Sequence, residues 1–86
     1  MTPGQIIRTN TGYEFRVKRY TVVDNMPIAV LEAHDSQQPF VMCVGLRLLP
    51  NGRCAFDRPI WFSRFDDALY EFDVEKTKKK MERYAI

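Results

Sequence analysis

The fold is decided by residues 40–84, which read FVMCVGLRLLPNGRCAFDRPIWFSRFDDALYEFDVEKTKKKMERY. Phe40–Leu49 is apolar at nearly every position, as expected for a strand near the centre of a sheet. The Asn51-Gly52 pair is typical of a tight hairpin turn, and Arg53–Phe62 follows as the partner strand. Pro59 cannot donate a ladder hydrogen bond, so we expect an edge strand or a bulge there.

A helix is predicted directly after this hairpin. Ser63 is a suitable N-cap, because Asp66 can reach back to it as in a capping box and Asp67 adds negative charge to the first turn. No Gly or Pro interrupts residues 64–86, so we expect the helix to continue to about Tyr84.

The first half of the chain supplies further strands. Residues 5–9 predict a short strand, which a turn at residues 10–12 connects to a longer strand over residues 13–23. The apolar phase of the longer strand switches near Arg19, which indicates a bulge or a sharp twist. Residues 24–27 are expected to turn and residues 28–34 to form another strand. We therefore predict an α+β protein: a twisted antiparallel sheet of four or five strands, open or rolled toward a small half-open barrel, with one long C-terminal helix packed on it.

The composition is that of an ordinary globular protein. The 86 residues are expected to form a single domain over residues 1–86. The net charge of +2 is far below the excess expected of a dedicated nucleic-acid binder. The N-terminal segment has no apolar core of signal-peptide length, and no apolar run approaches the ~18 residues of a membrane span. We therefore expect a cytoplasmic protein that does not enter a membrane.

Two cysteines, Cys43 and Cys54, lie on either side of the hairpin turn. A two-residue turn would place Cys43 opposite Ile60. A three-residue turn would place it opposite Pro59, with the two thiols on different faces of the sheet. Neither register predicts a disulfide, which suits a reducing compartment.

The predicted helix carries two apolar stripes. The first stripe should pack on the sheet and consists of Phe65, Ala68, Leu69 and Phe72. The second stripe lies roughly 140° around the helix and consists of Tyr70, Val74, Thr77, Met81 and Tyr84. One sheet can hardly cover both stripes. The second stripe is therefore interpreted as a seam for a homodimer or a protein partner; in the alternative interpretation, the helix breaks near Asp73 and its tail packs on its own core.

The end of the helix is basic, which raises the alternative of nucleic-acid binding. The residues concerned are Lys76, Lys78, Lys79, Lys80 and Arg83, with Arg16, Lys18 and Arg19 as further phosphate contacts and Tyr20 as a stacking partner. A structural interpretation competes with this one. Acidic residues in the first half of the helix and basic residues in the second half complement the helix dipole.

Catalysis and metal binding have little support in the sequence. Cys43 as a nucleophile, with His34 as its base and Asp35 behind it, is the only enzyme-like set. No glycine-rich phosphate loop or metalloprotease motif occurs, and two cysteines and one histidine without a paired spacing make a poor metal site. We therefore expect no cofactor and no metal, and we predict a small non-catalytic binding or assembly protein.

The aromatic residues at the strand-to-helix junction are Trp61, Phe62 and Phe65. They are interpreted either as a ligand-accepting pocket or, more simply, as core residues that close off the end of the sheet.

Overall fold

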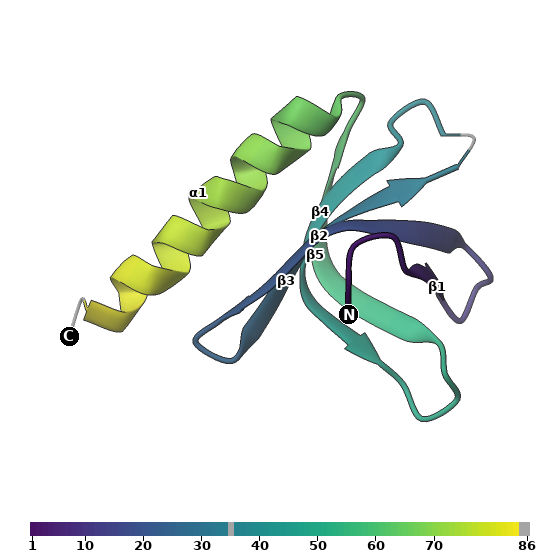
Figure 1. Ribbon diagram of the computed structural model, residues 1–86, viewed down its shortest axis with the longest axis horizontal. Helices are drawn as coiled ribbons and strands as arrows, with labels where there is room; N and C mark the ends of the chain where they lie inside the picture. The colour runs from purple at the N-terminus through teal and green to yellow at the C-terminus, as the bar shows by residue number, and fades with distance from the viewer. Residues whose placement is uncertain (35, 85–86) are drawn as a thin grey trace.

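The computed structural model describes the backbone of residues 1–34 and 36–84 and the side chains of residues 1–34 and 36–78. Five strands precede one helix, and the elements are β1 (Ile6–Arg8), β2 (Glu14–Val23), β3 (Met26–Ala33), β4 (Phe40–Leu48), β5 (Cys54–Phe62) and α1 (Phe65–Tyr84). The strands form one antiparallel sheet in the order β1-β2-β3-β4-β5. The sheet curls into a half-barrel, and α1 lies along one side of it, across the molecule from β1 (Figure 1). The predicted α+β class and architecture are confirmed.

Irregular pairings in three strands accompany the curl of the sheet. In β2 the register shifts between Val17 and Arg19, where Lys18 is an extra residue, so the predicted bulge is confirmed. In β4 a shift falls between Val44 and Arg47, and Gly45 there has a φ of 69°. Such irregularities increase the local twist of a sheet, which allows five strands to close partly on themselves.

The third irregularity lies in β5. Met42 pairs with Ile60 and Val44 with Asp57, so β5 carries one more residue than β4 over this stretch. The extra residue falls at Arg58–Pro59, and Arg58 has a φ of 48°. The bulge that Pro59 predicted is therefore present.

The seam of the half-barrel is joined by backbone at one end. Thr9, just after β1, forms a parallel bridge with Cys54 at the start of β5. Beside this bridge, the Nδ2 of Asn51 donates a hydrogen bond of 3.0 Å to the Oδ1 of Asn10. Because β1 is only three residues long, backbone pairing between the first and last strands does not continue beyond this bridge.

Two hydrophobic cores lie on the two faces of the sheet. The inner core fills the half-barrel and consists of Ile7, Phe15, Val17, Ala29, Leu31, Val41, Cys43, Leu46 and Cys54. The outer core lies under the helix and consists of Ile28, Val30, Met42, Val44, Ala68 and Phe72. Successive residues of β3 and β4 alternate between the two cores, which explains why both strands are apolar on nearly every position.

One turn differs from the sequence-based expectation, and another selects between the two alternatives considered. The turn between β2 and β3 contains only Asp24 and Asn25, both with positive φ, so Met26 and Pro27 belong to β3 rather than to the turn. In the β4–β5 hairpin, the N–H of Leu49 donates to the carbonyl of Arg53, so the connection is the three-residue turn.

Both cysteine thiols are free and lie in the inner core. The prediction that a three-residue turn puts Cys43 and Cys54 on different faces is therefore wrong. The bulge at Gly45 shifts the alternation of β4 by one residue, and this shift returns Cys43 to the face that Cys54 occupies.

Helix α1 begins one residue later than its predicted cap implies. The N–H of Ala68 donates to the carbonyl of Arg64 at 3.3 Å, so Arg64, not Ser63, occupies the N-cap position. Asp66 and Asp67 lie in the first turn as predicted. The helix is continuous through Asp73, so the alternative in which it breaks there is wrong.

Candidate functional site: an aromatic groove at the mouth of the half-barrel

The first apolar stripe of α1 packs on the sheet as predicted, with Ala68 and Phe72 buried in the outer core. On the second stripe, Tyr70 is 69% exposed and Val74 is half-buried. Thr77 is exposed, and its hydroxyl donates to the carbonyl of Asp73 at 3.0 Å. The side chains of the other two members, Met81 and Tyr84, lie outside the described residues.

The predicted basic end of α1 is described at two positions. The Nζ of Lys76 lies 3.4 Å from a carboxylate oxygen of Asp73 and 5.2 Å from the ring centre of Phe72. Lys78 is exposed. The side chains of Lys79, Lys80 and Arg83 lie outside the described residues.

The basic residues of β2 do not join this end of the helix. The charged groups of Lys18 and Arg19 lie 5.6 and 5.2 Å from the ring centre of Phe65, at the first turn of α1. Phe65 is eleven residues from Lys76, which corresponds to about 16 Å along a helix. Tyr20 packs against the inner core. The structure therefore places Lys18 and Arg19 away from Lys76 and Tyr20 against the inner core, and nucleic-acid binding stays a prediction.

The enzyme-like set is not assembled. Cys43 is fully buried and pairs with Ala29 of β3, whereas His34 is an exposed residue five positions beyond Ala29, about 16 Å along a strand. Burial, with smaller contributions from the negative charges of Cys54 and Asp57, raises the pKa of the Cys43 thiol to about 12. Asp35 lies outside the described residues. Among the residues that the structure does describe, no group of three His, Cys, Asp or Glu side chains is arranged to hold a metal ion.

A concave site lies at the mouth of the half-barrel, where the seam between β2 and β5 opens. It is a groove of about 1140 Å³. The lining residues come from the β1–β2 turn and the start of β2, from the end of β3 and the β3–β4 loop, and from β5 and the residue after it. They are Thr9, Thr11, Gly12, Tyr13, Glu14, Phe15, Ala33, His34, Ser36, Gln37, Gln38, Phe56, Trp61 and Ser63. We call this site the aromatic groove.

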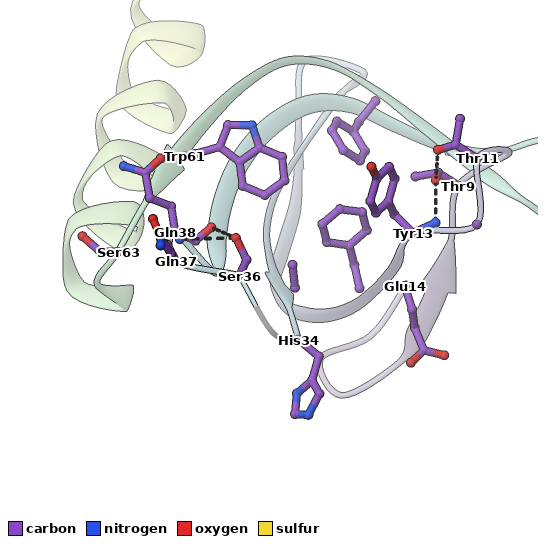
Figure 2. Close-up of a pocket in the computed structure, with 14 residues that line it drawn as sticks. Thr9, Thr11, Tyr13, Glu14, His34, Ser36, Gln37, Gln38, Trp61 and Ser63 are labelled. Carbon is purple, nitrogen blue, oxygen red and sulfur yellow. Dashed lines mark hydrogen bonds between the residues drawn. The ribbon is translucent and has the colours of Figure 1, made fainter.

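Aromatic side chains bridge the seam where backbone pairing stops. Phe15 of β2 is buried, and its ring meets Phe56 of β5 edge-on, with ring centres 5.7 Å apart. The ring centre of Trp61 lies 6.1 Å from that of Phe15. Trp61 is 40% exposed and Tyr13 is 69% exposed, and both line the groove together with the two phenylalanines. Figure 2 shows Trp61 and Tyr13 on two sides of the groove. The groove therefore has a buried aromatic floor and two accessible aromatic walls.

The margin of the aromatic groove is polar but almost uncharged. Among the lining residues that the structure describes, Glu14 and His34 are the ionisable ones besides Tyr13, and Figure 2 shows both side chains pointing away from Trp61 and Tyr13. Glu14 accepts hydrogen bonds of 3.1 and 2.9 Å from the guanidinium of Arg8. The lining residues that the structure describes include no lysine and no arginine.

Several hydroxyl groups of the margin already hold the two turns in place. The hydroxyls of Thr9 and Thr11 are 2.9 Å apart, and that of Thr9 accepts a hydrogen bond from the Tyr13 N–H at 3.2 Å. The hydroxyl of Ser36 donates to the carbonyl of Gln38 and accepts from its N–H. These bonds fix the backbone on both sides of the groove.

Sequence patterns identify only part of this site. They group Trp61 with Phe62 and Phe65 at the strand-to-helix junction, but Trp61 enters the aromatic groove whereas Phe62 and Phe65 pack in the outer core. In a regular strand, Phe56 and Trp61 would face opposite sides, because they are five residues apart. The bulge at Arg58–Pro59 puts both on the concave side, and Pro59 is the signal in the sequence that could have revealed it.

Comparison of the chain with protein-family models, with curated proteins and with solved structures finds no match in any of the three. No helix within the described part of the chain is long and apolar enough to cross a membrane. The fold and the groove together define a small single-domain α+β chain with one accessible aromatic cleft.

Proposed function

We propose that this chain is a small non-catalytic binding protein and that it holds a protein partner in the aromatic groove. The single observation that carries the proposal is the pair of accessible aromatic side chains, Trp61 and Tyr13, that line one groove together with the buried ring of Phe15. Large aromatic side chains in a concave, partly dry site supply most of the binding energy in protein interfaces. The burial of Cys43 also supports a role without covalent catalysis.

A random-peptide display selection tests this proposal. Peptides enriched on the wild-type protein should bind the Tyr13→Ala variant at least about tenfold more weakly, because truncation of an interface aromatic costs that much or more. Leu48→Ala is the control, since Leu48 is an exposed apolar residue (57%) that does not line the groove. Enriched peptides that bind Tyr13→Ala as well as the wild type, or a selection without enrichment, would contradict the proposal.

A second candidate, self-association through the outer face of α1, is favoured by the 69% exposure of Tyr70. Tyr70 lies on the helix face opposite the residues that pack on the sheet, so a second copy can reach it. Sedimentation velocity should detect a dimer that weakens when Tyr70 or Met81 is changed to Asp, with the far-UV circular dichroism unchanged. A monomer at the highest soluble concentration would refute self-association.

A further inference from the structure

We propose that the aromatic groove takes a proline-rich segment of its partner in the polyproline II conformation. This inference rests on the proposed function and adds the chemistry of the ligand. It follows from the kind of surface that the groove offers, from the backbone of β5 and from the charges of the lining residues.

The edge of β5 argues against a ligand that adds as a further strand. Beyond the bridge between Thr9 and Cys54, β5 is the last strand of the sheet over the residues that the structure describes, so its outer backbone groups face the seam. Pro59 has no N–H to offer, and the positive φ of Arg58 kinks the strand at the same point. An added strand would lose its hydrogen bonds in the middle of the groove.

A polyproline II segment does not need that edge. It has no internal hydrogen bonds, it is largely preformed before binding, and it docks through its ring faces and its backbone carbonyls. Trp61 and Tyr13 offer aromatic surfaces on the two sides of the groove. The indole N–H of Trp61, the hydroxyl of Tyr13 and the side-chain amides of Gln37 and Gln38 are donors of the kind that peptide carbonyls accept.

Two other ligand classes fit the groove less well. Single-stranded nucleic acid also stacks on aromatic rings, but it requires cations for its phosphates, and the described lining has no lysine or arginine. An oligosaccharide would require many free polar groups, but the hydroxyls of Thr9, Thr11 and Ser36 already bond within their turns. A ligand with apolar faces and a few carbonyl acceptors matches the aromatic surfaces and the side-chain donors of the groove.

The test uses the intrinsic fluorescence of Trp61, which is the single tryptophan of the chain and lines the groove. Titration of the full chain with an acetylated and amidated decaproline peptide should change the Trp61 emission in a saturable manner. The Tyr13→Ala variant should bind decaproline at least about tenfold more weakly. Leu48→Ala should bind it within about twofold of the wild type, since Leu48 is exposed but does not line the groove, and surface truncations outside an interface have little effect.

Three further probes complete the experiment: a Gly-Ser decapeptide, a deoxythymidine decamer and cellohexaose. A response to decaproline alone supports the proposal. A response to the deoxythymidine decamer or to cellohexaose without one to decaproline overturns it, and so does decaproline binding that Tyr13→Ala leaves unchanged. If the display selection returns Tyr13-dependent peptides without proline, the proposed function stands and only this inference fails; if no peptide binds, both fail.

Discussion

Substitution of Gly45 by Ala tests whether the bulge in β4 depends on the missing side chain. Gly45 has a φ of 69°, and a Cβ atom built on it would lie 2.7 Å from the Oδ2 of Asp57. An Ala in the left-handed region costs about 1 to 2 kcal/mol. The side chain of Asp57 must also move, which disturbs its ion pair of 3.2 Å with Arg47.

The expected loss of stability in Gly45→Ala is the sum of these two contributions. Both charged side chains of the pair are more than half exposed, so loss of their interaction adds less than about 1 kcal/mol. The total destabilisation is about 2 kcal/mol. For a domain of this size, each kcal/mol corresponds to a decrease of about 4 to 8 °C in Tm, which differential scanning calorimetry resolves easily.

Gly52→Ala is the matched control for this prediction. Gly52 also has a positive φ, 82°, but a Cβ atom added to it would meet no other atom within 4 Å. It therefore reports the backbone cost alone, and Gly45→Ala should be the more destabilising of the two. Equal decreases in Tm would refute the steric part of the reasoning. Asp57→Ala in the Gly45→Ala background should restore part of the lost stability, which gives a second check.

Two further predictions concern the cores. Phe72→Ala should lower the free energy of unfolding by about 3 to 5 kcal/mol in urea titrations, because its ring is buried between α1 and the sheet. Tyr70→Ala should change it by less than about 0.5 kcal/mol. Similar values for both variants would contradict the assignment of the face of α1 that packs on the sheet. The pKa of the Cys43 thiol rises from 9.0 to about 12 in the folded state, so the fold favours the protonated thiol. The stability that this preference contributes is complete below pH 9 and is lost as the pH rises toward 12. In the wild type, the urea midpoint of unfolding should fall between about pH 8 and about pH 11, and Cys43→Ala should reduce this fall. An equal fall of the midpoint with pH in the variant would argue against the burial of the thiol.

Much of the fold was predictable because its strongest signals are local. The continuous apolar run of β4, the Asn51-Gly52 turn and the uninterrupted helical segment each indicate one structure without reference to the rest of the chain. The phase switch near Arg19 likewise located the bulge in β2. Each of these features is set by the periodicity or the backbone preference of neighbouring residues.

The errors about the cysteines and the groove arose where distant parts of the sheet determine a residue's position. The faces of Cys43 and Cys54 depend on the combined effect of a three-residue turn and the bulge at Gly45, which no single stretch of sequence specifies. The aromatic groove depends on β1 ending early and on β2 meeting β5 across the seam, so Tyr13 and Trp61 come together from opposite halves of the chain. Periodicity carries no information about such a closure.

The seam of the half-barrel has a mechanical consequence. At the Thr9–Cys54 end, a backbone bridge joins the first and last strands, whereas at the groove the ring of Phe15 contacts those of Phe56 and Trp61 across the seam. Ring contacts can slide and separate by fractions of an ångström at a small energetic cost, but a hydrogen-bonded ladder cannot. A change in the width of the groove therefore need not break any backbone hydrogen bond between the paired strands.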